Sequence, residues 1–222
     1  MNPPATTPPA RAPRTLSRDE RRAQLIEATL ATIAECGFSR TTLTEVARRA
    51  GLSHGLVLFH FETKDKLFAE TLDYLSEEYR RNWQAALDGA GPNPEQRLAA
   101  LVEADFSPQV CQPSRLYSWC AFWGESQSRP LYLEQCGGND EAYSHVMEGI
   151  CAEMNARYGY SVDPVRAARL IRITVEGTWL ELITTINPYS QDEAKRTVWT
   201  CASVLYPRHF SPEGLIGAGS AK

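Results

Sequence analysis

Several features that would place a protein in a membrane, outside the cell or around a metal are absent from this sequence. No apolar run approaches the roughly 18–20 residues that a membrane helix needs, and residues 1–15 are rich in Pro, Ala and Arg instead of carrying the apolar core of a signal peptide. The six cysteines form no C-x-x-C pair and the four histidines form no H-x-x-x-H pair, so no zinc site is predicted. We therefore expect a cytoplasmic protein with no membrane segment, no metal and no cofactor.

Catalytic and redox motifs are scarce as well. The sequence contains no convincing acid, base, nucleophile or cofactor motif, and we therefore expect no enzyme. In a chain without export features, the cysteines are expected to be reduced thiols, with Cys36 and Cys201 as small core residues. Cys111, Cys120 and Cys136 flank a region rich in aromatic residues, which leaves redox sensing open as an alternative.

Strand patterns of useful length are also missing, whereas apolar residues recur at helical spacing along most of the chain. Breakers such as the run GAGPNP at residues 89–94 separate the helical stretches. The predicted fold is all-α, with about nine helices. Apart from two short helices near the N-terminus, the expected helices cover residues 18–36, 65–88, 94–106, 114–127, 139–158, 163–186 and 190–206.

The stretch from Gly37 to Leu67, GFSRTTLTEVARRAGLSHGLVLFHFETKDKL, predicts two short helices around a tight turn, followed by the start of a third helix. Gly51 ends the first short helix, because glycine adopts the left-handed conformation of a helix exit at little steric cost. Ser53 can cap the next helix through its hydroxyl. Two helices joined by a turn of about three residues form a helix-turn-helix, whose second helix can lie in a DNA major groove. The apolar face of the first short helix consists of Leu43, Val46, Ala47 and Ala50.

This stretch resembles the TetR-type bacterial repressors. The family pattern is approximately G-F-x-x-T-T-x-x-x-[IV]-A-x-x-A-G-[VL]-S-x-G-x-x-Y-x-[HY]-F-x-x-K-x-x-L. One departure is Leu58, which stands where family members commonly place a tyrosine hydroxyl on a phosphate. The positions that match in register are Gly37, Phe38, Thr41, Thr42, Val46, Ala47, Ala50, Gly51, Ser53, Gly55, His60, Phe61, Lys64 and Leu67.

The resemblance also implies which side chains meet double-stranded DNA. His54, Leu56 and His60 occupy positions that the family presents to DNA, and Leu56 could touch a thymine methyl group. Thr42 is predicted mainly as a helix cap, and Lys64 adds its charge at the positive end of a helix dipole, where a phosphate can bind. The residues expected to pack the second short helix onto its neighbours are drawn from Leu52, Val57, Phe59 and Phe61. The predicted DNA-binding set is Thr42, Arg48, Ser53, His54, Leu56, Phe59, His60 and Lys64.

Charge is distributed unevenly along the chain. Residues 1–66 contain ten Lys and Arg against seven Asp and Glu, a net +3, whereas residues 67–222 contain thirteen against twenty, a net −7. A basic head on an acidic body suits DNA binding, because only the head must neutralise phosphates. Arg11, Arg14 and Arg18 form a predicted arm that meets DNA, with a solubilising tail as the alternative. Because the second short helix has few polar base readers, the arm and the shape of the DNA are expected to contribute to specificity.

The body contains an aromatic stretch, LYSWCAFWGESQ at residues 116–127, on a predicted helix. Trp119 shares a helix face with Phe122 and Trp123, which follow three and four residues later. Such a stripe is more often ordinary core, but carboxylates nearby in the sequence suit a pocket for a cationic organic ligand. A neutral aromatic ligand fits the same residues. The predicted ligand-binding set is Glu103, Phe106, Trp119, Phe122, Trp123, Glu176 and Trp179.

Three body segments resemble the choline-responsive BetI-type branch of that family: EQRLAALVEADF at 95–106, SWCAFWGESQSRPLY at 118–132 and EGTWL at 176–180. The resemblance implies a repressor of genes for conversion of choline to glycine betaine, with a choline-like inducer. The last two predicted helices also have broad apolar faces. Family members pair such C-terminal helices into homodimers, which spaces two heads for a palindromic operator; simple burial within one subunit is the alternative.

Together these observations predict a disordered arm at residues 1–17, a DNA-binding domain at 18–64, a ligand-binding and dimerisation domain at 65–207 and a C-terminal tail at 208–222. The predicted function is a ligand-responsive transcriptional regulator, a repressor released from its palindromic operator by a small-molecule inducer. The helix at residues 65–88 belongs to both units and is the predicted lever between them. The alternative is a small-molecule-binding or redox-sensing helical protein with weak or lost operator recognition.

Overall fold

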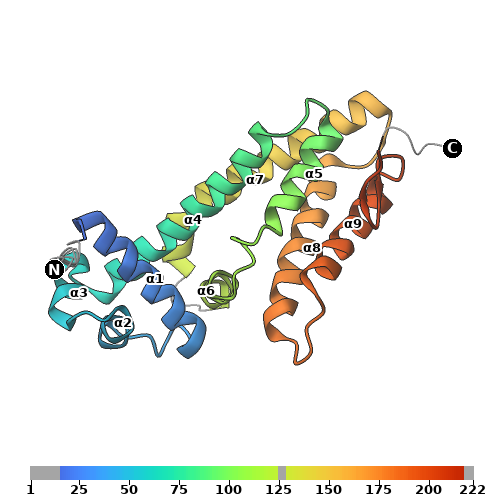
Figure 1. Ribbon diagram of the computed structural model, residues 1–222. Helices are drawn as coiled ribbons and strands as arrows, with labels where there is room; N and C mark the ends of the chain where they lie inside the picture. Colours follow the sequence, from blue (N-terminus) through green and yellow to red (C-terminus); the bar gives the residue numbers. More distant parts are fainter. Residues whose placement is uncertain (1–15, 125–128, 218–222) are drawn as a thin grey trace, which may run out of the picture.

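The computed structural model describes residues 16–124 and 129–217, which form nine α-helices and one β-hairpin (Figure 1). The prediction of an all-α fold is confirmed, apart from this short hairpin. The helices are α1 (Arg18–Cys36), α2 (Leu43–Ala50), α3 (His54–Phe61), α4 (Lys64–Asp88), α5 (Pro94–Asp105), α6 (Pro113–Gly124), α7 (Arg129–Tyr158), α8 (Pro164–Thr184) and α9 (Gln191–Leu205), and the strands are β1 (Phe210–Ser211) and β2 (Gly214–Leu215).

Polar side chains begin most of these helices by accepting hydrogen bonds from backbone N–H groups that have no partner inside the helix. At α1, the Ser17 hydroxyl accepts from the Glu20 N–H at 3.1 Å, and the Glu20 carboxylate accepts from the Ser17 N–H at 2.7 Å. This reciprocal capping box fixes the start of the helix. The caps of α2, α3, α4, α8 and α9 are Thr42, Ser53, Thr63, Asp163 and Ser190.

Gly51 makes the turn between α2 and α3. Its φ of 66° and ψ of 32° are left-handed, a conformation that glycine adopts without a Cβ penalty. The N–H of Leu52 donates to the carbonyl of Ala47 at 2.9 Å and closes the exit of α2. At the other end of α3, Glu62 is the only non-glycine residue within the described ranges with a positive φ, 61°. Two sharp turns therefore set the direction of α3 relative to α2 and α4.

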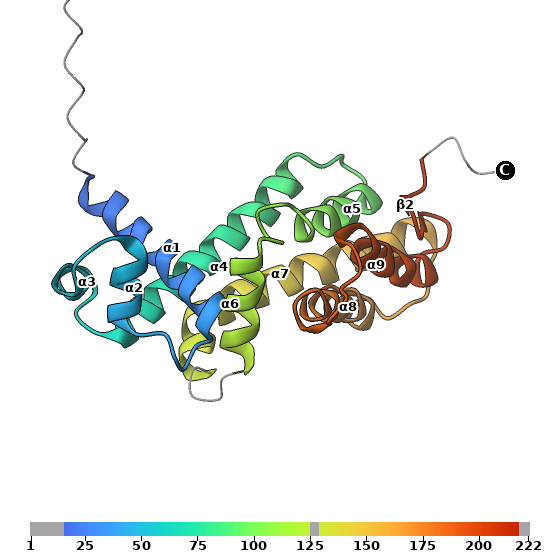
Figure 2. The ribbon, with the colours of Figure 1, turned by 60° about the horizontal axis from the view of Figure 1, so that its bottom comes forward.

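The molecule is elongated, with α1, α2 and α3 at one end and α8 and α9 at the other (Figure 1). α4 runs from the first end toward the second, and α7 packs along it. α6 lies between the two ends, where it packs against α1 and also contacts α8 (Figure 2). α8 and α9 pack side by side. We call α1–α3 the head and α5–α9 the body, with α4 shared between them.

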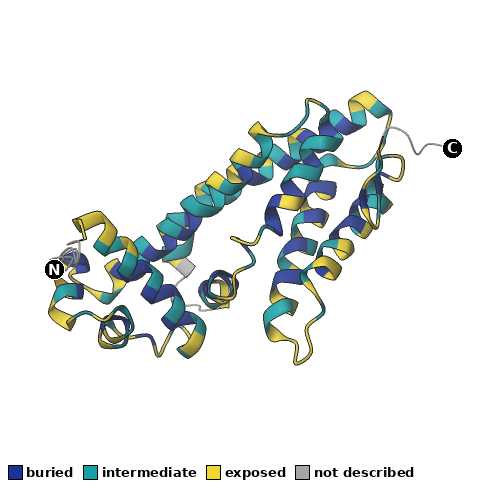
Figure 3. Cartoon of the chain, in the orientation of Figure 1, coloured by how far each residue is buried: buried dark blue, intermediate teal, exposed yellow. Residues whose placement is uncertain are grey.

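Two hydrophobic clusters hold the chain together, and their buried residues line the inward faces of the helices (Figure 3). The head cluster contains Leu30 of α1, Val57 of α3 and Leu72 of α4, and it extends to Trp119 and Phe122 of α6. The body cluster joins α5, α7, α8 and α9. Burial of apolar surface stabilises both clusters by about 25 cal/mol per Å² removed from water. Helix α6 is therefore tied to the head by packing, although it lies far from it in the sequence.

One helix starts earlier than its sequence pattern predicts. α7 begins at Arg129, not near residue 139. Pro130 lies in its first turn, where a residue without an N–H leaves no hydrogen bond unmade. Gly137 and Gly138 remain inside the helix, since packing of α7 against α4 and α8 overrides their low helix propensity. Residues 125–127 of the helix predicted at 114–127 lie outside the described residues.

The predicted C-terminal tail contains ordered structure. β1 and β2 pair in antiparallel fashion, with Phe210 opposite Leu215. The Phe210 ring stacks on Trp199 of α9, with centroids 5.7 Å apart and an interplanar angle of 12°. The sequence contains no strand pattern for this hairpin, because a two-residue strand held by stacking on a helix leaves no periodic signal. Residues 1–15 of the predicted arm and 218–222 of the tail lie outside the described residues. Of the helices that the structure describes, none is long and apolar enough to cross a membrane.

Candidate DNA-binding face and ligand pocket

The second helix of the helix-turn-helix, α3, buries one face and exposes the other. Val57 and Phe61 are 0% and 1% exposed and pack it into the head, as predicted. Phe59 is 69% exposed and Leu58 is 38% exposed, so Phe59 does not belong to the packing face. Leu56, predicted to face DNA, is half-buried. The exposed face of α3 therefore consists of His54, Gly55, Leu58 and Phe59.

Two of the predicted DNA-binding residues act first as helix caps. The Thr42 hydroxyl accepts from the Glu45 N–H at 3.2 Å, and the Ser53 hydroxyl accepts from the Leu56 N–H at 3.2 Å. His54 lies at the start of α3, with its Nδ1 3.2 Å from the hydroxyl of Thr44 on α2. Both caps are exposed, so the helix starts that can hold an anion are accessible.

The basic residues of the head differ in how free their charges are. The Arg48 side chain is 68% exposed and pairs with Glu45 at 2.5 Å within the same helix. The Lys64 ammonium lies 4.9 Å from the ring centroid of Phe68 and 6.0 Å from that of Phe38. Contact with aromatic faces restrains a half-buried cation. The ammonium of Lys64 is therefore held in one direction at the first turn of α4.

His60 is less accessible than its predicted role requires. It is 8% exposed, and its backbone carbonyl accepts from Arg22 of α1 at 2.5 Å. Burial, followed by the charges of Arg22, Arg18 and Arg21, lowers the pKa of His60. A neutral imidazole has one N–H donor. Because the residue is only 8% exposed, no more than an edge of the ring can meet a phosphate. In the predicted arm, Arg18 is exposed, whereas Arg11 and Arg14 lie outside the described residues.

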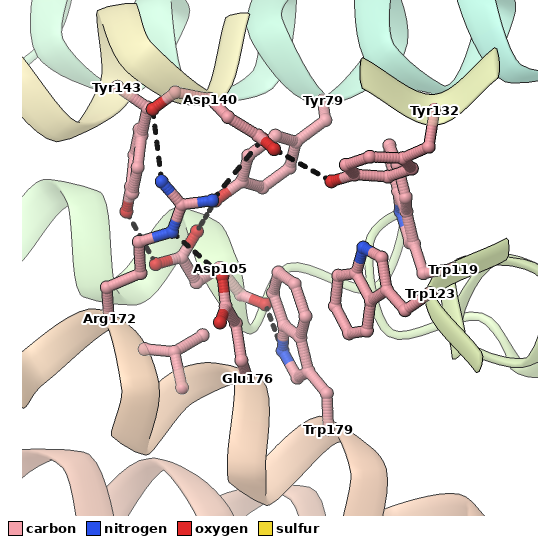
Figure 4. A pocket seen from close by; sticks show the side chains of 11 residues that line it. Tyr79, Asp105, Trp119, Trp123, Tyr132, Asp140, Tyr143, Arg172, Glu176 and Trp179 are labelled. Carbon is pink, nitrogen blue, oxygen red and sulfur yellow. Dashed lines mark hydrogen bonds and ion pairs between the residues drawn. The ribbon is translucent and has the colours of Figure 1, made fainter. Parts of the chain in front are cut away.

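The body contains a cavity lined mainly by aromatic and charged side chains (Figure 4). It has about 370 Å³ of empty space, part of which is open to solvent. The Trp119 and Trp123 rings stack 6.2 Å apart, and Tyr132 meets Trp119 edge-on at 6.3 Å. The other lining residues come from four helices: Tyr79 of α4, Asp105 of α5, Asp140 and Tyr143 of α7, and Arg172, Val175, Glu176 and Trp179 of α8.

Asp105 is the most buried charged group of this pocket, with 1% exposure. Its two carboxylate oxygens accept hydrogen bonds from the hydroxyls of Tyr79 and Tyr143, each at 2.7 Å. The indole N–H of Trp179 donates to the backbone carbonyl of Asp105 at 3.1 Å. Burial raises the pKa of Asp105 to about 7, while the hydrogen bonds from the tyrosines act in the opposite direction. Asp105 therefore both fixes three aromatic rings and carries a proton that exchanges near neutral pH.

A second charged group, around Arg172, forms another side of the pocket (Figure 4). Its guanidinium donates to Glu176 at 2.8 Å and to the Ser144 hydroxyl at 2.6 Å, and it lies 3.3 Å from the Asp140 carboxylate. Tyr132 donates to the other oxygen of Asp140 at 2.8 Å. Among the described lining residues, three carboxylates thus face one guanidinium, and the charge balance of the pocket is negative.

The structure brings four of the seven predicted ligand-binding residues into this cavity: Trp119, Trp123, Glu176 and Trp179. Glu103 instead lies on the exposed side of α5 and pairs with Lys195 of α9 at 2.8 Å. Phe106 is buried in the body cluster and Phe122 in the head cluster. Helix geometry explains why the other three predicted residues lie elsewhere. Successive residues of a helix point about 100° apart, so only part of each helix faces the cavity.

Comparison with known proteins agrees with this architecture. Residues 25–71 match the family "Bacterial regulatory proteins, tetR family", and residues 94–206 match "BetI-type transcriptional repressor, C-terminal". An HTH-type transcriptional regulator BetI from Paraburkholderia xenovorans is 34% identical over 184 residues, which are 81% of this chain and 90% of that protein. The chain belongs to the TetR family, in its BetI-type branch. It is a DNA-binding transcriptional regulator and not an enzyme.

Further relatives of this BetI-type regulator agree in sequence and in fold. The BetI regulator of Paraburkholderia phymatum is 35% identical over 188 residues, which are 83% of this chain and 92% of that protein. A crystal structure assigned to a transcriptional regulator of Pseudomonas aeruginosa superposes with a TM-score of 0.73 at 28% identity, covering 88% of this chain and 96% of that one. The likeness extends over both head and body.

Helix α6 connects the two candidate sites of this regulator. Trp119 lines the cavity, whereas Phe122, three residues later, packs edge-on against Phe38 at 5.3 Å in the head. Arg115, at the start of the same helix, donates to Glu27 of α1 at 2.6 Å and to Glu78 of α4 at 3.1 Å. Side chains of α6 thus contact both the cavity and the head.

Sequence reasoning missed more than half of the pocket. Seven lining residues were not in the predicted set, and they lie on four helices with no common motif in their spacing: Tyr79, Asp105, Tyr132, Asp140, Tyr143, Arg172 and Val175. A partial signal existed at residues 103–106, where a helix turn carries two acidic residues and a phenylalanine. Only the packing of α5 decides that Asp105, and neither Glu103 nor Phe106, meets the cavity.

The cysteines provide little support for redox sensing. Burial raises the pKa of Cys111 and Cys136 to about 12, and that of Cys120 to about 11. The thiolate is the reactive form, and it is scarce for such thiols at neutral pH. Cys36 and Cys201, predicted as core residues, are only half-buried. Cys201 packs against the margin of the body cluster, and Cys36 belongs to neither cluster.

Proposed function

We propose that this regulator is a homodimeric repressor whose operator affinity falls when a small organic cation binds the aromatic pocket. In this proposal residues 18–64 bind the DNA, with contacts from Thr42, Arg48, Ser53, His54, Leu56, Phe59, His60 and Lys64. Residues 65–207 bind the inducer and the second subunit. A ligand lowers operator affinity only to the extent that it binds better to the conformation with wrongly spaced heads.

The observation that carries the ligand class is the combination of aromatic rings with surplus negative charge. Trp119, Trp123 and Trp179 present ring faces and edges around the cavity, and tryptophan is the strongest cation–π partner among side chains. Arg172 offsets the charges of Asp140 and Glu176 only in part. Asp105 lies beneath the rings without a direct cationic partner among the described residues. An organic cation, choline in particular, would complete this charge balance.

The proposed dimer interface is an exposed apolar stripe on α8, extended by α9. Leu170, Ile173 and Leu180 are 50%, 56% and 47% exposed, and their spacing places them on one side of the helix. A Cβ added to Gly177, within the same stripe, would meet no atom within 4 Å. Val204 of α9 is 77% exposed. Such a surface is costly in a monomer but suits a self-complementary pair of helices from each subunit.

The proposed coupling runs through α6 as well as through α4. α4 carries Tyr79 in the cavity and Lys64 at the DNA-binding face. α6 carries Trp119 in the cavity and Phe122 in the head cluster. Closure of aromatic rings around a cation would move both helices together, because packed cores shift as units.

The test measures operator binding by fluorescence anisotropy, using the intergenic DNA beside the gene and a random duplex as control. Choline should weaken the selective binding, whereas dimethylbutanol, its neutral isostere, should not. Trp123→Ala should abolish the choline effect, and Tyr117→Ala serves as the matched control, since Tyr117 also lies on α6, is 40% against 38% exposed, and does not line this cavity.

Three outcomes separate the parts of this proposal. Equal responses to choline and to its neutral isostere would exclude a cation-selective pocket. Choline binding without any change in operator affinity would exclude the proposed linkage. A protein that sediments as a monomer at micromolar concentration would exclude the homodimer, and Ile173→Glu should produce that monomer if the α8 stripe is the interface.

A further inference from the structure

The exposed face of the recognition helix has an unusual chemistry for a surface that reads DNA. From His54 to Phe61, the sequence HGLVLFHF contains no Arg, Lys, Asn, Gln, Asp or Glu. These six residue types make the hydrogen bonds that distinguish base pairs in the major groove. His54 is the one polar side chain on the exposed face, and its Nδ1 already lies 3.2 Å from the Thr44 hydroxyl.

Two large apolar side chains occupy this face instead. Phe59 is 69% exposed, and its ring meets His60 edge-on at 5.2 Å. Leu58, its neighbour, is 38% exposed. The head core does not require them, because Val57 and Phe61 fill the inward face of the same helix with at most 1% exposure. Both side chains therefore remain available to a partner with an apolar surface.

The surroundings of the two side chains suit the DNA groove. Gly55 lies on the same face one turn earlier, and a Cβ added there would meet no atom within 4 Å. The fold thus imposes no need for glycine at this position, but its absent side chain lets the helix backbone come close to base edges. Arg48, in the last turn of α2, precedes α3 in the chain, and Lys66, in the first turn of α4, follows it; each side chain is exposed and pairs with a neighbouring carboxylate, Glu45 and Glu62 respectively. A DNA phosphate can compete for such exposed cations.

We propose that Leu58 and Phe59 read the 5-methyl groups of thymines in the major groove, so that each half-site carries T·A pairs beneath α3. The thymine methyl is the apolar feature that distinguishes base pairs in that groove. Specificity then comes from excluding water between carbon surfaces, with phosphate contacts supplying the position. This inference rests on the proposed operator binding and names the chemical feature that the head recognises.

The experiment first selects duplexes with the full-length protein from a random-sequence library. The selected duplex is then made with deoxyuridine in place of thymidine beneath α3, which removes methyl groups and keeps every base-pair hydrogen-bonding group. Loss of one methyl contact should weaken binding about fourfold, and loss of one in each half-site about fifteenfold. Anisotropy titrations measure the ratio of the two dissociation constants for each protein variant.

Protein variants show whether the two side chains are the readers. Leu58→Ala and Phe59→Ala should bind the thymidine duplex more weakly and lose the difference between thymidine and deoxyuridine. Leu133→Ala, at a 61% exposed leucine on α7, should keep that difference in full. Because the mutated residues are exposed, unchanged melting temperatures are expected and would separate lost recognition from lost folding.

The outcomes distinguish this inference from the proposed function. A selected duplex that binds equally well with deoxyuridine, or that has no thymine beneath α3, would overturn methyl reading and leave operator binding intact. Full discrimination by both Leu58→Ala and Phe59→Ala would overturn methyl reading in the same way. A selection that enriches no sequence at all would overturn operator binding and this inference together.

Discussion

The head of this regulator exposes Leu58 and Phe59 to solvent, whereas the body encloses Asp105 beneath three aromatic rings. The candidate DNA-binding face of the head comes from one contiguous stretch, residues 42–64, and its direction is set by two tight turns. The pocket combines residues of α4, α5, α6, α7 and α8. The candidate DNA-binding face is therefore a local surface on one short helix, whereas the pocket depends on the packing of five helices.

The difference shows how a surface is kept available for binding. On the head, exposed apolar residues stay in place because buried neighbours on the same short helix fix the backbone. In the pocket, charged residues stay in place because tyrosines and arginine satisfy them; without those partners each would destabilise the core. Mutations of the exposed residues of α3 should consequently act on binding alone, whereas mutations of the pocket residues should act on both binding and stability.

Phe122→Ala tests the link between the regions and should have the largest effect. This ring is fully buried and packs against Phe38 and Phe68. Its loss should lower the free energy of unfolding by about 3–5 kcal/mol. Phe59→Ala is the matched control on an exposed ring and should change it by less than about 0.5 kcal/mol. Urea denaturation followed by circular dichroism measures both, and equal effects would contradict the division into packing and presenting faces.

Asp105→Asn tests the buried carboxylate. The folded protein holds this proton up to about pH 7, whereas an unfolded chain releases it near pH 4. The free energy of unfolding should therefore fall as the pH rises between these values, by about 2 kcal/mol from pH 5 to pH 8 relative to the variant. Urea titrations at several pH values measure this difference. A wild-type curve parallel to that of the variant would show that Asp105 does not titrate in this range.

Arg115→Met removes the charge that joins α6 to α1 and α4. The Arg115 side chain is 9% exposed, and that of Glu78 beside it is 15% exposed. The Glu78 carboxylate would therefore lose its cationic partner at a poorly hydrated position. The expected loss is about 1–2 kcal/mol of unfolding free energy, since Glu27 is more exposed and can rehydrate. Arg80→Met breaks an exposed pair within α4 and should cost at most about 0.5 kcal/mol. Thermal melts compare the two, and equal losses would count against a buried link.

Arg48→Ala should have the smallest effect, confined to DNA binding. If each Arg48 meets one phosphate, the slope of log K against log salt should become less steep by about 2 in a dimer. Arg157→Ala, at an exposed arginine in the last turn of α7, should leave the slope unchanged. Anisotropy titrations between 50 and 200 mM salt provide the measurement, because phosphate contacts make the affinity fall strongly over this range. An unchanged slope for Arg48→Ala would remove it from the phosphate-binding residues.

The head could be predicted from the sequence almost residue by residue. Ser53, Gly51 and Thr42 act through hydrogen bonds and dihedral angles that involve neighbours within five residues. Such local interactions depend on the order of residues alone. The sequence did not reveal that Phe59 points outward while Phe61 points inward, because an apolar helix has no contrast between faces from which its orientation could be predicted.

The sequence by itself determined an all-α regulator with a helix-turn-helix and an aromatic stripe on α6. Tertiary structure alone decided which side of that stripe lines the cavity: Trp119 and Trp123 do, whereas Phe122 lies in the head core alone. It also selected Asp105 over Glu103, two residues apart on α5 and on different sides of it. The physical reason is that helix periodicity fixes the angles between side chains, while the rotation of the helix relative to its neighbours is set by long-range packing.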